Sequence, residues 1–252
     1  MKSLAGVTRY KETIISIAGD PKTSKTWLSF TSCPPIYYHE FDVGSLNRVL
    51  PHLPKETIAA SFFEVYPLLS LEAALDVSVA KTLLGKFRTE YRRSVIEAAK
   101  VGGTVIIDTE SLWWELIQTV LVPADEGKKM GGLKYGPANT DYRGAVSFAR
   151  DPAHRCNLIL IHQTKEIWEG GAPTGRREPH GHKENLSIVD VRLLTMKPFL
   201  GAGKTDFRVK IDNCGLDPNL EGIVIDPSGK TPGSIQSPAT LGTIKELLRL
   251  ED

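Results

Sequence analysis

Short apolar segments of strand length alternate with longer amphipathic segments along most of the chain. This alternation is typical of α/β proteins, in which helices cover a mainly parallel central sheet. We predict strands at 13–19, 36–44, 61–68, 102–111, 156–163, 186–197, 206–212 and 221–226. We predict helices at 25–32, 71–100, 112–121, 140–149 and 241–250. The C-terminal strands are expected to be antiparallel.

Two long polar segments interrupt this pattern. The first, Pro123 to Pro137, is rich in glycine and lysine and shows little periodicity. The second runs from Thr164 to Asn185 and is also polar. We predict that both are loops, and loops of this length within a compact domain are usually functional. The sequence contains no internal repeat and no domain boundary, so we predict a single domain over residues 1–252.

Composition narrows the classes of function. Hydrophobic residues make up 41% of the chain and charged residues 24%, as in ordinary globular proteins. The formal net charge is +1, so a surface that binds a polyanion must be local. The three cysteines form no CxxC pair, which indicates a reduced, intracellular protein. No apolar run approaches the ~18 residues of a membrane span, so we expect a cytoplasmic protein without a membrane partner.

The segment after the first strand nearly matches the phosphate-binding pattern G-x-x-x-x-G-K-[ST]. Such a loop needs backbone amides around a phosphate, a lysine for the terminal phosphates and a hydroxyl for Mg²⁺. Gly19 provides the turn out of the strand, and Lys25 and Thr26 provide the cation and the hydroxyl. Ser24 stands in place of the second glycine, where a small side chain is the least damaging replacement. We predict that the nucleotide-binding residues are Gly19, Asp20, Pro21, Lys22, Thr23, Ser24, Lys25, Thr26 and Trp27.

Two alternatives bear on this motif. A polar turn that contains a Lys-Thr pair by chance would give the same short match, although the strand before it and the helix after it favour a phosphate loop. A second Gly-Lys-Thr run occupies residues 203–205, but an alternating strand pattern follows it. A hairpin turn explains that second run better.

Acidic residues at predicted strand ends supply the remaining candidates. Asp108 ends the buried strand in "TVIIDTES" and is predicted to hold Mg²⁺ together with Thr26. Hydrolysis also requires a group that orients or deprotonates the attacking water. Glu40 and Asp42 end the second strand, and Glu110 lies two residues after Asp108. All three stay open for that role, and any of them can equally be a solvated surface acid.

The order of these segments resembles a known family. "TVIIDTES", the first loop, a helix, "NLILIHQTKE", the second loop and "NLSIVDVRLLT" follow one another as in RecA-like recombinases. Over roughly residues 14–226 the chain resembles the short phage-type RecA-fold ATPases, some of which act with single-stranded DNA in annealing or recombination. The resemblance implies a RecA-like P-loop NTPase fold and a DNA-stimulated ATPase that uses ATP and Mg²⁺. It also implies a homo-oligomer, a ring or filament, in the cytoplasm of a bacterial host if a phage encodes the chain.

The resemblance also assigns roles to individual residues. Gln163 matches the glutamine that senses the γ-phosphate, and Lys210 matches a lysine presented to a neighbour's nucleotide. The two loops match DNA-contacting loops, the second of which also carries Lys165, Trp168, His180 and His182. The candidate DNA-binding residues are Lys128, Lys129, Lys134, Tyr135, Arg176, Arg177 and Lys183. Solvated loops without DNA contact, a nucleotide-binding scaffold with little hydrolysis and a small-molecule kinase remain alternatives.

Overall fold

The computed structural model describes residues 11–67, 76–122, 132–183, 185–196 and 207–250. Within these residues the main sheet has eight strands in the order β10-β9-β8-β1-β5-β4-β2-β3. The strands are β1 (Ile14–Gly19), β2 (Ile36–Glu40), β3 (Ser61–Val65), β4 (Thr104–Asp108), β5 (Asn157–Ile161), β8 (Val191–Met196), β9 (Arg208–Cys214) and β10 (Val224–Ile225). All pairs from β8 to β3 are parallel, whereas β9 and β10 pair antiparallel. The predicted fold class is confirmed: an α/β protein with a mainly parallel sheet and antiparallel C-terminal strands.

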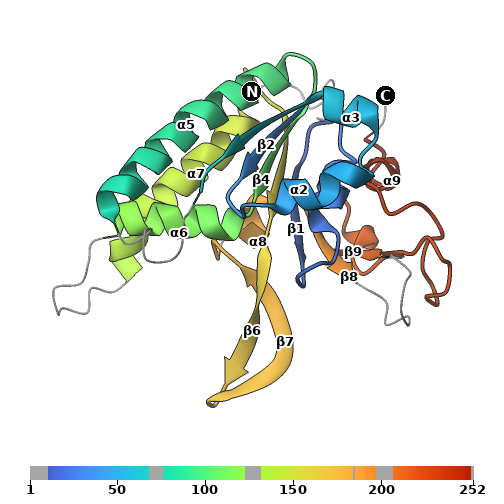
Figure 1. The fold of residues 1–252 in the computed structure, drawn as a ribbon. Coiled ribbons are helices and arrows are strands. Elements are labelled where there is room, and N and C mark those ends of the chain that lie inside the picture. Colours follow the sequence, from blue (N-terminus) through green and yellow to red (C-terminus); the bar gives the residue numbers. More distant parts are fainter. Residues whose placement is uncertain (1–10, 68–75, 123–131, 184, 197–206, 251–252) are drawn as a thin grey trace, which may run out of the picture.

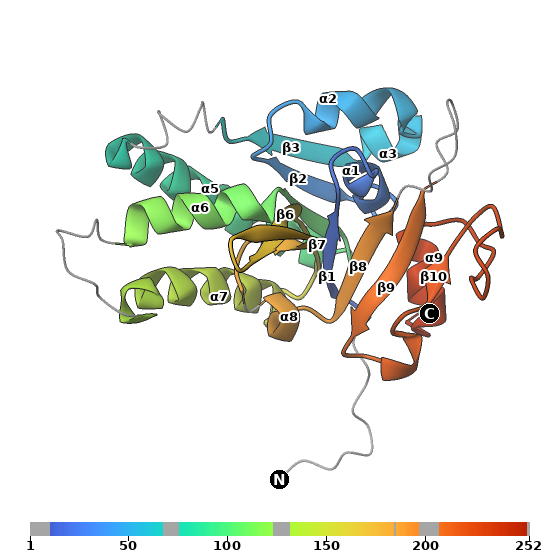
Figure 2. The same ribbon diagram turned by 90° about the horizontal axis from the view of Figure 1, so that it is seen from below.

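Helices cover both faces of this sheet (Figures 1 and 2). The helices are α1 (Lys25–Ser29), α2 (Ser45–Val49), α3 (Lys55–Ala59), α5 (Val77–Ala99), α6 (Glu110–Leu121), α7 (Gly136–Arg150), α8 (Asn185–Ile188) and α9 (Leu241–Leu247). Short 3-10 turns lie at Leu50–His52, Gly132–Tyr135 and Pro218–Leu220. Side chains alternate between the faces, so Val105 and Ile107 pack against α5, α6 and α7, and Ile106 packs on the side of α1, α2 and α9.

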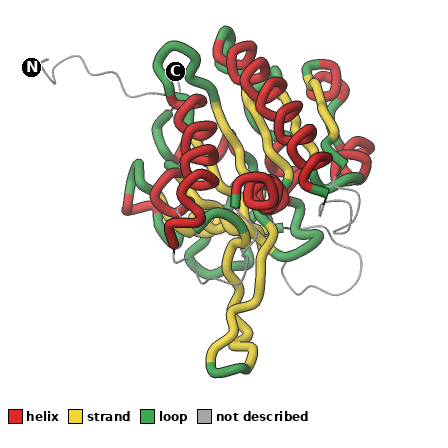
Figure 3. Tube along the Cα trace, turned by 90° about the vertical axis from the view of Figure 1, so that its left-hand side faces the viewer, coloured by secondary structure: helices red, strands yellow, loops and turns green. Residues whose placement is uncertain are grey.

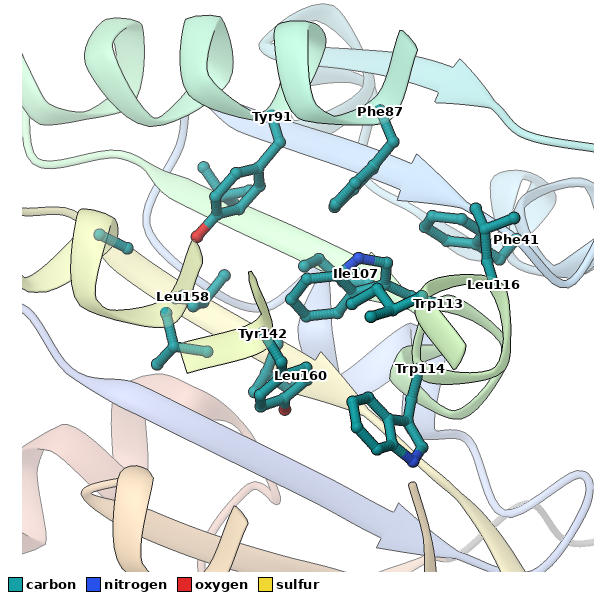
Figure 4. Packing of buried hydrophobic residues seen from close by; sticks show 14 of the residues in the cluster. Phe41, Phe87, Tyr91, Ile107, Trp113, Trp114, Leu116, Tyr142, Leu158 and Leu160 are labelled. Atoms are coloured by element: carbon teal, nitrogen blue, oxygen red, sulfur yellow. The ribbon is translucent and has the colours of Figure 1, made fainter. Parts of the chain in front are cut away.

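Aromatic side chains fill the core between the sheet and helices α5, α6 and α7. Figure 4 shows Trp113 of α6 among Phe87 and Tyr91 of α5 and Tyr142 of α7. The rings of Trp113 and Tyr142 stack with centroids 4.7 Å apart. This layer fixes α6, and with it the chain that leaves β4 at Asp108.

The predicted loop from Thr164 to Asn185 is wrong. Strands β6 (Gln163–Glu169) and β7 (Ala172–His180) form an antiparallel hairpin that projects from the body, and we call residues 163–180 the arm (Figures 1 and 3). Gly170 and Gly171, with φ of 60° and 83°, make its two-residue turn. None of the arm's described side chains belongs to the two hydrophobic clusters of the core. Its sequence therefore lacks the alternation of apolar residues that marks a half-buried strand.

Other boundaries also differ from the predictions. The strand predicted from 186 begins only at Val191, because residues 185–188 form α8, and Ile188 at its end and Val189 after it pack on the core. Strand β2 ends at Glu40 rather than at residue 44, and α2 and α3 follow in a segment for which no helix was predicted. The predicted helix residues 71–75, loop residues 123–131 and the Gly-Lys-Thr run at 203–205 lie outside the described residues.

Candidate nucleotide-binding site

The predicted phosphate loop lies at the carboxyl end of β1. In the sheet β1 stands between β5 and β8, so the chain passes to opposite sides of β1. In open α/β sheets this switch point is where ligands bind. The loop of residues 20–24 leaves Gly19 and leads directly into α1, as the motif requires (Figure 2). The prediction of a strand, a loop and a helix around this motif is therefore confirmed.

Local contacts fix the conformation of the loop. A Cβ atom on Gly19 would lie 2.2 Å from Oγ1 of Thr195, so only glycine fits there. The hydroxyl of Thr23 lies 2.7 Å from that of Thr195 and donates to the carbonyl of Asp20 at 2.7 Å. Ser24 has φ of 66° and ψ of 24°, in the left-handed region. This backbone explains why the motif carries glycine at that position.

Replacing Ser24 with glycine should therefore stabilise the protein. Relief of the left-handed strain contributes about 1 kcal/mol, which corresponds to a rise in Tm of roughly 2–4 °C for a domain of this size. Thermal unfolding measures the change. Ser78→Gly, in the first turn of α5, is the control and should lower Tm because its backbone is helical. A fall in Tm for Ser24→Gly would contradict the strain.

Lys25 is held over the loop that precedes it. Its Nζ donates to the carbonyl oxygens of Gly19 and Asp20 at 2.8 and 2.9 Å. Burial lowers the pKa of Lys25, and the carboxylates of Asp108, Asp20 and Asp42 oppose that shift. The ammonium of Lys25 is therefore surrounded by carboxylates and lies beside the amides that would cradle a phosphate.

Thr26 and Asp108 meet across the site, although β1 and β4 are not neighbours in the sheet. The hydroxyls of Thr26 and Tyr38 both donate to Oδ2 of Asp108, each at 2.7 Å. A hydroxyl and a carboxylate suit Mg²⁺, which protein sites commonly bind through one or two carboxylates plus substrate phosphates. In the described part of the chain no three His, Cys, Asp or Glu side chains cluster as a metal site. The pair therefore fits a magnesium ion shared with phosphates, not a cage made by protein alone.

Asp108→Asn should raise stability at pH 7. Burial raises the pKa of Asp108 to about 6, while the hydrogen bonds from Thr26 and Tyr38 partly offset this. A raised carboxyl pKa means that the folded state binds the proton more tightly, so wild-type stability falls as pH rises from about 4 to about 6. The amide oxygen of asparagine can accept both hydroxyls without that charge. We expect a gain of about 2 kcal/mol at pH 7 that vanishes near pH 4, measured by urea unfolding without nucleotide. An unchanged or lower stability at pH 7 would show that the carboxylate is not strained there.

A cavity of about 550 Å³ surrounds these groups. Its lining residues are Gly19, Pro21, Lys22, Thr23, Ser24, Lys25, Thr26, Trp27, Asp42, Ser45, Arg48, Val49, Asp108, Thr109, Gln163 and Thr164. Asp42 and Gln163 both line this cavity. Arg48 also lines the cavity, and it donates to the hydroxyl of Ser45 at 2.9 Å. It was not predicted as a site residue, because helix α2 was not predicted. The one sequence feature that could have indicated it is a basic residue shortly after the end of a strand.

The other candidate acids have structural roles. Glu40 is buried, and its Oε1 accepts the amides of Gly44 and Leu46 at 3.0 and 2.9 Å, so it holds the start of α2. Glu110 is fully buried away from the cavity lining.

Lys210, the lysine matched to a neighbour's nucleotide, lies on β9, also outside that lining, with its Nζ 3.4 Å from Asp212.

Glu110 anchors the base of the arm. Its Oε1 accepts the amide of His182, and its Oε2 lies 2.9 Å from Nδ1 of His162, although the ring is not aligned as in an ideal hydrogen bond. Burial alone would raise the pKa of Glu110, but His162 and the His182 amide outweigh it and the pKa is lowered. Nearby, Ser111 donates to the carbonyl of His180 and accepts the amide of Gln163. Both ends of the arm are therefore tied to the helix that follows Asp108.

Among the predicted DNA-binding residues, Arg177 has the most specific position. Its Nε lies 2.7 Å from Oδ1 of Asp20 in the phosphate loop, and its guanidinium also donates to the hydroxyl and the carbonyl of Thr164 at 3.0 and 2.9 Å. Lys183 is exposed, and Lys134 lies over the ring of Tyr135 at 5.3 Å. Arg176 lies on β7, and Lys128 and Lys129 fall outside the described residues.

His182 does not belong to an exposed DNA-contacting surface. It is buried, and its ring stacks on Tyr142 at 4.3 Å. Lys165, on the arm, pairs with Glu178 on the facing strand at 3.3 Å. Trp168 is 62% exposed near the tip. The arm thus exposes the ring of Trp168, whereas the charge of Lys165 is paired with an acid.

A second pocket adjoins the phosphate loop. It has a volume of about 360 Å³, and its walls include Trp27, Phe207, Pro227, Pro238 and Thr240. The rings of Trp27 and Phe207 meet edge to face with centroids 5.2 Å apart. Trp27 also borders the larger cavity, so the two pockets meet at its side chain. A ligand could therefore place a flat apolar group in the smaller pocket and an anion on the loop.

The fold is α/β with a mainly parallel sheet, and the candidate site lies where the first strand leads through a glycine-initiated loop into a helix. No protein-family model matches the sequence, and no curated protein does either. Among solved structures the chain is similar to an ATPase from the type III secretion system of pathogenic bacteria, with 16% identity and a TM-score of 0.43 over 73% of this chain. The chain spans about half of that ATPase, 51% of its length. It is also similar to the genome packaging NTPase B204 of Sulfolobus turreted icosahedral virus 2, with 8% identity and a TM-score of 0.35, covering 81% of this chain and 93% of that one.

None of the described helices is both long enough and apolar enough to cross a bilayer.

Proposed function

We propose that this protein binds and hydrolyses ATP in the presence of Mg²⁺. The observation that carries the proposal is the convergence of Lys25, Thr26 and Asp108 around one cavity at the switch point of the sheet. Lys25 would contact the phosphates, and Thr26 and Asp108 would hold the ion that bridges them. The ion would neutralise charge on the phosphate oxygens.

The base and the attacking water have candidate positions. The apolar pocket beside Trp27 and Phe207 suits a purine, which would pack against these rings and the prolines that also line the pocket. Asp42 is the favoured group for orienting the water, because it lines the cavity whereas Glu40 is engaged by two backbone amides. Gln163, also in the lining, would sense the terminal phosphate through its side-chain amide.

Release of inorganic phosphate from ATP by the full chain, with Mg²⁺ and then with EDTA, tests this function. Magnesium-dependent release supports hydrolysis. Binding of ATP without release would select the alternative, a nucleotide-binding scaffold. Failure to bind ATP or any other nucleoside triphosphate would overturn the proposal.

We further propose that nucleotide state controls contact with single-stranded DNA through the arm. The supporting observation is the exposed Trp168 near the tip, a surface on which a base can stack. The arm carries equal numbers of positive and negative residues, with Lys165, Arg176 and Arg177 against Glu166, Glu169 and Glu178. Binding would therefore depend on stacking more than on phosphate contacts, and its salt dependence would be shallow. Phosphate release that an added oligonucleotide leaves unchanged would count against DNA coupling.

The proposed assembly is a homo-oligomeric ring or filament. Lys210 lies outside the lining of its own chain's cavity, which is consistent with a role toward a neighbouring chain. Light scattering with and without the nucleotide measures the mass. A monomer under both conditions would exclude the assembly and the role of Lys210.

A further inference from the structure

Arg177 links the arm to the phosphate loop, and its partner there is an acid. Asp20 is the first loop residue after Gly19, so its carboxylate lies on the element that would receive a polyanion. A like charge at this place disfavours phosphate binding unless it is neutralised. Arg177 supplies that neutralisation from a strand that is distant in sequence.

Arg177 can readily exchange Asp20 for another anionic partner. The side chain of Arg177 is 42% exposed and that of Asp20 57% exposed, and ion pairs in such settings contribute little to stability. Arginine forms stronger, bidentate hydrogen bonds with phosphate oxygens. A phosphate that comes within reach should therefore compete successfully with the Asp20 carboxylate for the guanidinium.

The base of the arm brings Arg177 beside the nucleotide cavity. Thr164, which accepts from Arg177, lines that cavity, as do Gln163 and Asp108. Thr164 also hydrogen-bonds Asp20 at 3.1 Å. The charge of Arg177 is near enough to Lys25 to contribute to lowering the lysine pKa. Arg177 and Asp20 line an adjoining pocket that shares Gly19, Thr23 and Thr164 with the nucleotide cavity. The guanidinium therefore lies across the start of the phosphate loop from the metal pair and must turn toward the nucleotide cavity to reach a terminal phosphate.

We propose that Arg177 contacts the terminal phosphate of a bound nucleoside triphosphate, and that it leaves Asp20 to do so. Arg177 is then a phosphate ligand delivered by the arm of the same chain. Its transfer from Asp20 to the phosphate also changes what holds the base of the arm. The inference rests on the proposed nucleotide function and adds a residue and a partner exchange to it.

Two substitutions at this pair should act in opposite directions. Arg177→Ala removes the phosphate ligand, so affinity for a non-hydrolysable ATP analogue should fall about tenfold, with little change for ADP. Asp20→Asn frees Arg177 and removes a like charge, so affinity for the same analogue should rise severalfold. Calorimetric titration of the full chain with magnesium and each nucleotide measures both. Arg88→Ala is the matched control, because Arg88 of α5 is likewise a partly exposed arginine paired with an aspartate, Asp141 of α7, and lies outside the cavity lining.

A second measurement reports on the arm independently of affinity. In the wild type, amide hydrogen exchange within β6 and β7 should differ between the ATP analogue and ADP. In Arg177→Ala it should be the same with both nucleotides, and Arg177→Lys should restore part of the difference.

The outcomes separate this inference from the function on which it rests. If Arg177→Ala and Asp20→Asn weaken triphosphate binding alike, the pair is merely structural and the inference is wrong. The same follows if Arg177→Ala leaves triphosphate binding and arm exchange unchanged, while the wild type still binds both nucleotides. A wild-type chain that binds neither nucleotide overturns the proposed function and this inference together.

Discussion

Lys25→Ala should reduce ATP affinity by roughly 10- to 100-fold, as expected from losing a charge-assisted hydrogen bond to phosphate. Phosphate release should fall below detection. The physical reason is that Lys25 is the cation held over the loop by the carbonyls of Gly19 and Asp20. Titration with a fluorescent ATP analogue and a phosphate-release assay measure the two effects.

The fold should survive this substitution. Burial lowers the pKa of Lys25, which means that the charged ammonium is less favourable in the folded protein than in water. Lys81→Ala, at an exposed position of α5, is the matched control and should keep both affinity and turnover. If Lys25→Ala binds ATP as tightly as the wild type does, the nucleotide does not use this loop.

Glu110→Ala should destabilise the protein by about 3–5 kcal/mol, the range for removing one partner of a buried pair. The change leaves the amide of His182 without its acceptor and removes the carboxylate 2.9 Å from the ring of His162, in a fully buried place. Because the pKa of Glu110 is lowered in the fold, its contribution is present above the ordinary glutamate pKa and is lost as pH falls. Urea unfolding at pH 7 and at lower pH measures it.

Glu115→Ala tests whether this effect is specific to the buried acid. Glu115 lies on the same helix, is 41% exposed and is 3.9 Å from His180. Its removal should change stability by less than about 1 kcal/mol. A loss of similar size for both variants would mean that Glu110 acts through helix α6 in general and not through its contacts at the base of the arm.

Much of the fold followed from the hydrophobic pattern because the central strands β1, β4 and β5 are buried on both faces. Segments such as Thr104–Asp108 and Asn157–Ile161 are continuous apolar runs, and the long α5 shows helical periodicity. The arm escaped prediction because neither of its faces packs on a core. Its one local signal was the Gly170-Gly171 pair, which is a hairpin turn when strands flank it. The short helices α2 and α3 lack enough turns for periodicity to show.

The site divides in the same way. Lys25, Thr26 and Asp108 were predictable because the motif and the buried strand end define their places in sequence. The ion pair between Arg177 and Asp20 was not predictable. The two residues are far apart in sequence, and only the folded arm brings them together. Likewise the sequence left Glu40, Asp42 and Glu110 equivalent, and backbone contacts that depend on tertiary structure distinguish them.

A crystal structure of the full chain with Mg²⁺ and a non-hydrolysable ATP analogue tests the central claim most directly. The account predicts phosphate oxygens against the amides of residues 20–26, the ion on Thr26 and Asp108, and the base beside Trp27. Phosphates bound elsewhere, or a loop in which the Ser24 side chain fills the phosphate position, would contradict it.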